Sequence, residues 1–192
     1  MTRPSLLVIF ALGLQACGGQ DAPSARPDII LLTVDTLRVD NVSAYNPNSR
    51  ARTDNIDSLA AEGIRFERAY SPISVTGPAF CSMHTGRRPG LHGVVLNIFR
   101  GGTPLPSDVS TLAQILKAQG YKTGAFVSGF TLRPELGLDR GFDTYEWPED
   151  LQRPGEETAA SAVSWLQAQE GPVFLWFHSF DPHGPLHKWP TP

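Results

Sequence analysis

The sequence predicts an α/β sandwich in which helices flank a largely parallel central sheet. Apolar runs with the composition of buried strands occupy residues 28–34, 121–129 and 172–180. Residues 53–63, 110–120 and 156–171 carry apolar side chains at helical spacing. Strands that alternate with helices along a chain are typical of a parallel sheet with crossover connections.

The ends of the helical segments carry their own signals. Each of the three segments stops at a glycine, namely Gly63, Gly120 and Gly171. A further short strand is predicted at residues 64–70, directly after the first helix. The continuous apolar run at residues 28–34 favours a strand that is buried on both faces.

The composition indicates one globular domain and excludes some partners. The chain has 192 residues, of which 41% are hydrophobic and 18% charged. Its net charge of −3 provides no basic surface for nucleic acid. Small anionic substrates remain compatible with this charge, because a local metal ion or arginine can outweigh a mildly acidic surface.

The first residues are predicted to be a targeting segment. Residues 1–16 have a basic start at Arg3 and an apolar run at residues 6–14, the pattern of a signal peptide. The run is shorter than the ~20 residues of a membrane-spanning helix. Residues 17–27 are rich in glycine, proline and small polar residues, which favours a flexible tether.

The end of the signal peptide, "LQAC", resembles a bacterial lipobox. The resemblance implies lipidation of Cys17, and therefore an exported lipoprotein anchored in the membrane of the bacterial cell envelope, in the periplasm or at the outer membrane. Ordinary secretion without a lipid is the alternative. Only Cys81 remains in the rest of the chain, so we expect no internal disulfide.

Three groups of polar residues follow predicted strands. Asp35 comes directly after the first strand, Asp181 and His183 come after the last, and residues 74–87, "SVTGPAFCSMHTGR", lie between them. Ligands of parallel sheets gather at the carboxyl ends of the strands. Asp35 is therefore predicted to bind a divalent cation. Asp181 and His183 are predicted to contact a metal ion or the substrate. The alternatives are an Asp that caps a turn and a turn Asp with a surface His.

The stretch 74–87 contains several candidate nucleophiles. Gly77 and Pro78 break the chain, and a short helix can follow, with Thr76 at or just before its first turn. Free N–H groups and the helix dipole attract anions there, so the Thr76 hydroxyl is placed to attack a sulfate or phosphate ester. The alternative is that Thr76 only caps the helix. Cys81 and Ser82 fall inside the helix, where side chains usually pack.

Taken together, these stretches resemble the sulfatase family, within the alkaline-phosphatase-like superfamily. The segments that carry the resemblance are "PDIILLTVDTLRVDNVSAY", "TDNIDSLAAEGIRFERAYSP", "TGPAFCSMHTGRRPGLHGV", "LAQILKAQGYKTGAFVSG", "GFDTYE" and "FLWFHSFDPHGP". They occur in the family's order from Pro27 to the last residues. The resemblance implies an alkaline-phosphatase-like sandwich and a metal-dependent hydrolase of small-molecule or glycan sulfate or phosphate esters.

The family's nucleophile motif aligns Thr76 with its Cys or Ser, anchored by Pro78 and by the Thr-Gly-Arg at residues 85–87. In sulfatases that Cys or Ser is oxidised to formylglycine. A threonine would give a ketone by this route, so the resemblance implies an unmodified Thr76 alkoxide instead. Phe80 stands where the family usually has an arginine.

The remaining site residues are implied by the same resemblance. Asp35, Thr36 and Thr76 would bind a divalent cation (Ca, Mg, Mn or Zn), with Thr36 in place of the family's second aspartate. Thr76 and His183 would be catalytic, and Asp181 and His183 would contact the substrate.

The family's members continue well beyond the last residue of this sequence. Residues 28–192 are therefore interpreted as the N-terminal part of a sulfatase-like catalytic domain whose sandwich is incomplete at the C-terminus. The sequence is either a fragment of a longer enzyme or a truncated relative. A catalytically silent domain that keeps the fold for binding at the cell surface is the alternative to an enzyme.

Overall fold

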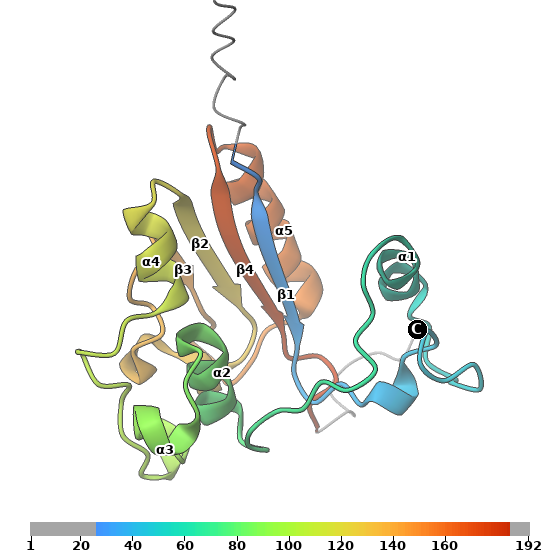
Figure 1. The fold of residues 1–192 in the computed structure, drawn as a ribbon, viewed down its shortest axis with the longest axis horizontal. Helices are drawn as coiled ribbons and strands as arrows, with labels where there is room; N and C mark the ends of the chain where they lie inside the picture. Colours follow the sequence, from blue (N-terminus) through green and yellow to red (C-terminus); the bar gives the residue numbers. More distant parts are fainter. Residues whose placement is uncertain (1–25, 185–192) are drawn as a thin grey trace, which may run out of the picture.

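A computed structural model describes residues 26–184, whose centre is a four-stranded sheet (Figure 1). The strands are β1 (Ile29–Val34), β2 (Lys122–Val127), β3 (Thr144–Glu146) and β4 (Val173–Ser179), in the order β1-β4-β2-β3. All three pairings are parallel. The predicted parallel sheet is thus confirmed, with β3 as an additional strand that the apolar pattern did not predict.

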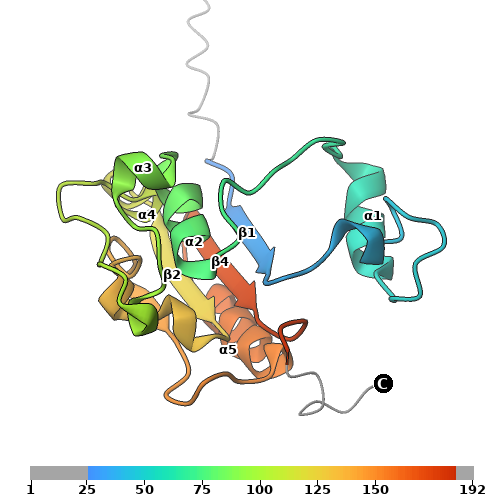
Figure 2. The same cartoon turned by 90° about the horizontal axis from the view of Figure 1, so that it is seen from below.

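Helices cover both faces of this sheet. Helices α2 (Thr76–Thr85) and α4 (Leu112–Ala118) lie on one face, and α5 (Gly155–Gln167) lies on the other (Figure 2). The other helical elements are α1 (Asp54–Glu62), α3 (Pro89–His92) and 3-10 turns at Val39–Asn41, Ile98–Arg100, Phe130–Leu132 and Pro134–Leu136. The α/β sandwich predicted from the alternating pattern is therefore confirmed.

The helix ends show why these segments fold locally. At the start of α4, the Thr111 hydroxyl accepts a hydrogen bond from the backbone N–H of Gln114 at 3.2 Å. The Gln114 side chain in turn accepts from the backbone N–H of Thr111 at 2.9 Å, which completes a capping box. Helix α2 ends at Gly86, whose φ of 64° is left-handed and favours glycine.

Strand β1 differs from its prediction, because it is buried on one face only. Ile30, Leu32 and Val34 are 43%, 57% and 37% exposed, whereas Ile29 and Leu31 pack against the core. The reason is that β1 is an edge strand and α5 packs against β2 and β4. An apolar run therefore does not distinguish a central strand from an edge strand.

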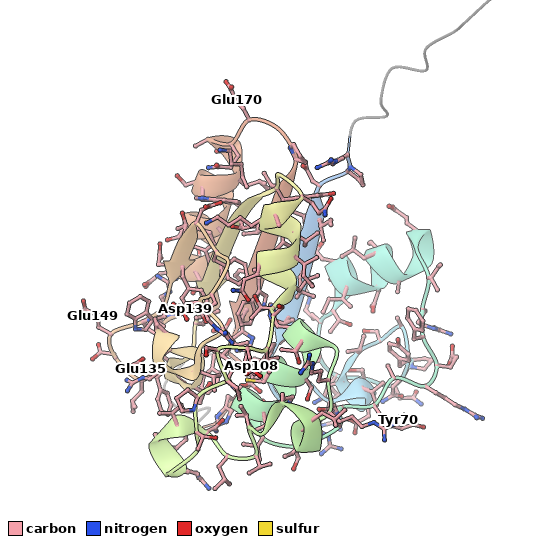
Figure 3. The ribbon with its side chains drawn as sticks, turned by 60° about the vertical axis from the view of Figure 1, so that its left-hand side comes forward. Tyr70, Asp108, Glu135, Asp139, Glu149 and Glu170 are labelled. Atoms are coloured by element: carbon pink, nitrogen blue, oxygen red, sulfur yellow. The ribbon has the colours of Figure 1, made fainter. Side chains whose placement is uncertain are left out.

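The predicted strand at residues 64–70 is wrong, since the structure shows no regular element there. Ile64, Phe66 and Tyr70 are exposed, and Figure 3 shows the Tyr70 side chain at the surface. A strand needs a second strand to pair with through backbone hydrogen bonds, and within residues 26–184 this segment pairs with none. Helix α1, which precedes it, stands apart from the sheet in both views (Figures 1 and 2).

The predicted signal peptide, Cys17 and nearly all of the tether at residues 17–27 lie outside the described residues. In residues 26–184, no helix combines the length and the apolar character that a membrane crossing requires.

Candidate active site

Asp35 is held at the carboxyl end of the sheet. Its backbone N–H donates to the carbonyl oxygen of Ser179 at the end of β4, at 2.9 Å. The next residue, Thr36, has a φ of 54°, a conformation that costs energy for a β-branched residue and turns the chain out of the sheet. Asp35 is only 8% exposed and lines a pocket.

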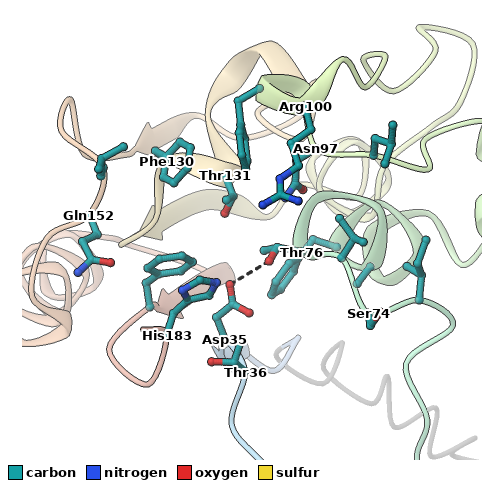
Figure 4. A pocket seen from close by; sticks show the side chains of 18 of the residues that line it. Asp35, Thr36, Ser74, Thr76, Asn97, Arg100, Phe130, Thr131, Gln152 and His183 are labelled. Carbon is teal, nitrogen blue, oxygen red and sulfur yellow. Dashed lines mark hydrogen bonds between the residues drawn. The ribbon is translucent and has the colours of Figure 1, made fainter. Parts of the chain in front are cut away.

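Thr76 is the first residue of α2, and its hydroxyl donates to Oδ2 of Asp35 at 3.1 Å (Figure 4). Val75 occupies the cap position, so Thr76 does not merely cap the helix. Burial raises the pKa of the Asp35 carboxyl, although the Thr76 hydrogen bond and the nearby His183 lower it. A carboxylate with a raised pKa next to a hydroxyl can accept that hydroxyl's proton.

The start of α2 offers fewer free N–H groups than the sequence predicts. The backbone N–H of Gly77 donates to Oδ1 of Asn97 at 2.7 Å, and Pro78 has no N–H. The N–H of Ala79 donates to the carbonyl oxygen of Val75 at 3.0 Å. An anion bound beside Thr76 therefore depends more on side chains than on the helix start.

Asn97 is a site residue that sequence reasoning missed. A Cβ at Gly77 would lie 2.7 Å from Oδ1 of Asn97, so only glycine permits this close approach. Because Oδ1 accepts from the backbone, the amide orientation is set, and the Nδ2 group remains a donor at the pocket wall. No local pattern predicts this contact, since Asn97 lies in a loop 20 residues after Gly77.

A pocket of about 650 Å³ opens in front of Thr76. Its polar lining includes Asp35, Thr36, Ser74, Thr76, Asn97, Arg100, Thr131, Gln152 and His183. Its apolar lining includes Leu96, Phe99, Phe130, Leu151 and Phe180. Thus Asp35, Thr36, Thr76 and His183, all predicted from the sequence, lie around one pocket.

Arg100 is the second residue that sequence reasoning missed. Its guanidinium lies 5.7 Å from the ring centroid of Phe99, and Figure 4 shows it directed into the pocket toward Thr76. A guanidinium presents several donors in a planar array that fits the oxygens of a sulfate or phosphate group. Arg100 therefore supplies a cation to a pocket whose lining also contains the Asp35 carboxylate.

His183 stacks on Phe180, with ring centroids 4.3 Å apart and an interplanar angle of 11°. Its Nδ1 lies 2.8 Å from the carbonyl oxygen of Gly184, which can only accept, so Nδ1 is assigned the proton. In the neutral ring Nε2 then carries a lone pair. Only the imidazolium form of His183 can donate a proton from Nε2.

Asp181 lies outside the pocket lining. Its Oδ1 accepts from the backbone N–H of Gly155 at 2.9 Å, and its Oδ2 accepts from the Ser179 hydroxyl at 3.0 Å. These bonds attach the last turn to the start of α5. The predicted substrate contact of Asp181 stays a prediction, and the geometry favours a structural role.

Cys81 and Ser82 pack inside α2, as expected from the sequence. Cys81 is fully buried, and burial raises the pKa of its thiol to about 12. The Ser82 hydroxyl donates to the carbonyl oxygen of Pro78 at 3.1 Å and lies 2.9 Å from Nε2 of His92. Neither residue lines the pocket in front of Thr76, whereas the Thr76 hydroxyl lies in its lining and donates to the Asp35 carboxylate.

The described residues offer an incomplete set of metal ligands. Within residues 26–184, no group of three or more His, Cys, Asp or Glu side chains could hold a metal ion. Asp35 contributes the one carboxylate, beside the hydroxyls of Thr36 and Thr76. A Ca²⁺ ion takes about 6–8 oxygen ligands. These residues alone do not form such a shell, so metal binding stays a prediction.

Comparison with known proteins identifies the family. The family model described as sulfatase matches residues 27–191. Bovine arylsulfatase A is 41% identical over 120 residues, covering 60% of this chain and 23% of that protein. Thus the chain spans about a quarter of the length of this curated relative.

Solved structures agree with the fold. A 2-O GAG sulfatase superposes with a TM-score of 0.67 at 25% identity, over 82% of this chain and 35% of that one. The phosphonate monoester hydrolase of Agrobacterium radiobacter has a TM-score of 0.69 at 22% identity, over 83% and 42% of the two chains. The match of the family model over residues 27–191 shows that the chain belongs to the sulfatase family, and the superpositions show its alkaline-phosphatase-like fold.

Proposed function

We propose that the protein is an ester hydrolase in which Thr76 is the nucleophile and the substrate is a sulfate or phosphate ester. The observation that carries the proposal is the hydrogen bond from the Thr76 hydroxyl to Oδ2 of Asp35 at 3.1 Å. It supplies a general base to a hydroxyl that faces a pocket with one exposed cation, Arg100.

In the proposed first step, Oγ1 of Thr76 attacks the sulfur or phosphorus atom and its proton passes to Asp35. The bond from that atom to the ester oxygen breaks, and the alcohol leaves with a proton from the imidazolium form of His183. A covalent sulfo- or phospho-threonine remains, and water releases the inorganic anion and restores Thr76. The Nδ2 group of Asn97 and the Arg100 guanidinium stabilise the charge that develops on the non-bridging oxygens.

The choice between sulfate and phosphate rests on the nucleophile and on the substrates for which the relatives are named. Bovine arylsulfatase A and the 2-O GAG sulfatase are named for sulfate esters, which supports a sulfate ester as substrate. An unmodified threonine differs from the formylglycine that the family's motif implies. Thr76 therefore favours chemistry that needs no oxidised side chain, for which a phosphate ester is an equal candidate.

Variants of the full-length protein test the role of Thr76. We expect Thr76→Ala to abolish hydrolysis of aryl sulfates and aryl phosphates, and Thr76→Ser to retain part of it, because serine keeps the hydroxyl. Cys81→Ala is the matched control, since Cys81 lies in the same helix but outside the pocket. Activity that survives in Thr76→Ala and disappears in Cys81→Ala would overturn the assignment.

A catalytically silent surface-binding domain is the second candidate, and it is favoured by Thr36 and Phe80, which stand where the family usually has an aspartate and an arginine. In the enzyme, by contrast, Asp35 and the hydroxyls of Thr36 and Thr76 would contribute to binding a cation. That cation would supply positive charge to stabilise an alkoxide. Calorimetric titration of the full-length protein with Mn²⁺, Zn²⁺ or Ca²⁺ separates the two candidates. Absence of both binding and turnover would favour the silent domain.

We further propose that the protein is exported and attached to the bacterial cell envelope through lipidated Cys17. The support is the order of basic start, apolar run and cysteine in residues 1–17. A tether at residues 17–27 would then allow the pocket to reach substrates away from the membrane surface.

A further inference from the structure

His178 is a fully buried histidine of β4, and it has no role in the proposed reaction. Its Nε2 atom has no hydrogen-bond partner among the described residues and lies 4.0 Å from Oδ2 of Asp35. That carboxylate oxygen is the one that accepts from Thr76. The Phe80 ring of α2 covers His178 edge-on, with centroids 4.8 Å apart, so the histidine lies behind the pocket and not in its lining.

The other ring nitrogen of His178 belongs to a buried hydrogen-bond cluster. Its Nδ1 lies 3.1 Å from the Thr33 hydroxyl, which also lies 3.0 Å from the carbonyl oxygen of Phe177. The indole N–H of Trp176 donates to the same hydroxyl at 3.0 Å. Thr33 has a single proton, so it donates either to Phe177 or to Nδ1 of His178.

The environment of Nε2 decides between these two arrangements. If Thr33 donates to Phe177, Nδ1 of His178 carries the proton, and the bare Nε2 lone pair faces the Asp35 carboxylate. Two buried acceptors would then face each other, which is unfavourable. If Thr33 donates to Nδ1, Nε2 carries the proton and points its N–H at the carboxylate. The second arrangement gives every ring nitrogen of His178 a complementary neighbour.

We propose that His178 is a positioning residue that orients Asp35 from behind the pocket, through an N–H at Nε2. This proposal rests on the proposed function of Asp35 as the base for Thr76. At 4.0 Å the contact is longer than a hydrogen bond, and an approach of about 1 Å would close it. Once closed, this contact fixes Oδ2 of Asp35 toward Thr76. The Thr33 hydroxyl, which accepts from the Trp176 indole N–H, fixes the imidazole in turn.

The protonated nitrogen can be identified directly. Long-range ¹H–¹⁵N spectra of the chain labelled at histidine report which ring nitrogen of His178 carries the proton. We expect the Nε2–H tautomer, and we expect Asp35→Asn to shift the Nε2 resonance more than Thr76→Ala does. A proton on Nδ1, or a resonance that is insensitive to Asp35→Asn, would overturn the proposal.

Two substitutions separate positioning from packing in the full-length protein. Glutamine reaches the position of Nε2 with an N–H donor, whereas asparagine reaches only the position of Nδ1. We expect His178→Asn to lower kcat roughly 10- to 100-fold with KM unchanged, because His178 does not line the pocket. We expect His178→Gln to recover most of the rate at equal thermal stability.

Equal rates in the two variants, or a change confined to KM, would contradict the positioning role. If the full-length protein hydrolyses no ester, the proposed function fails, and the tautomer of His178 still decides whether its N–H faces Asp35. The spectroscopic and kinetic arms therefore fail separately.

Discussion

His84 makes the stability of the fold depend on pH. It lies in α2 and is 1% exposed, with its ring centroid 4.2 Å from that of Trp176. Neither ring nitrogen has a hydrogen-bond partner among the described residues. Burial lowers the pKa of His84 from 6.5 to about 4, because the apolar surroundings disfavour the imidazolium.

The size of the effect follows from these two pKa values. The unfolded chain binds a proton at His84 below about pH 6.5, whereas the folded chain remains neutral there until about pH 4. The stability that His84 contributes by remaining neutral is therefore present above pH 6.5 and is lost as the pH falls toward 4. Between about pH 7 and about pH 5, linkage gives a loss of about 2 kcal/mol in the free energy of unfolding.

Denaturant unfolding followed by tryptophan fluorescence, at about pH 7 and about pH 5, measures this loss. His84→Phe keeps an aromatic ring against Trp176 but cannot titrate, so we expect it to lose about 2 kcal/mol less than the wild type on acidification. Val94→Ala, at another fully buried position, is the control. It lowers stability at both pH values and keeps the wild-type pH dependence.

His178 is another buried histidine that contributes to acid unfolding, because burial lowers the pKa of His178 to about 3. That contribution is common to the wild type and to His84→Phe, so the difference between them isolates His84. An identical pH dependence in both proteins would refute the reasoning. It would mean that His84 is hydrated, or that the unfolded chain keeps its environment.

Three further predictions concern other positions. Gly77→Ala forces Asn97 away from the start of α2 and should lower the free energy of unfolding by about 1–3 kcal/mol. Gly90→Ala is the control and should not lower the free energy of unfolding, because a Cβ there meets nothing within 4 Å. Equal losses for the two variants in denaturant unfolding would contradict the role of the Gly77–Asn97 contact. In a Cys17→Ser background, the Cys81 thiol should react with an aromatic disulfide reagent only after denaturation, because it is buried and its pKa is about 12. If the native protein reacted as fast as the unfolded protein, Cys81 would not be buried. Cys17→Ser should itself abolish incorporation of labelled fatty acid and move the protein to the soluble fraction, and unchanged membrane fractionation would rule out the lipid anchor.

The sequence predicted those elements whose signals are local. Helices α4 and α5 have apolar periodicity, and β2 and β4 are apolar runs between clear stops. The short β3 has no such run, and its three residues become a strand only by pairing with β2. The reverse error occurred at residues 64–70, where a strand-like composition finds no neighbour in the part of the chain that the structure describes.

The residues of the candidate site likewise fall into those with a local sequence signal and those without one. Asp35, Thr76 and His183 each follow a local signal, because each lies just after a predicted strand or at a predicted helix start. Asn97 caps the 3-10 turn Ile98–Arg100, and Arg100 is the last residue of that turn. Asn97 reaches the pocket through its tertiary contact to Gly77, and Arg100 through the course of this turn. Such contacts leave no period in the sequence, so the donors for an anion could not be predicted.

The hydroxyl of Thr33 has a consequence for strand alignment. The two faces of β1 are both aliphatic, so the apolar pattern does not choose between registers of β1 against β4. Thr33 pairs with His178 in the observed register. A slip of two residues would move β1 by about 7 Å and bring Leu31 or Asp35 to that place. With Leu31 there, Trp176 and His178 would lack their shared hydroxyl partner. The buried Thr33 hydroxyl thus favours the observed register, in which Asp35 lies beside Thr76.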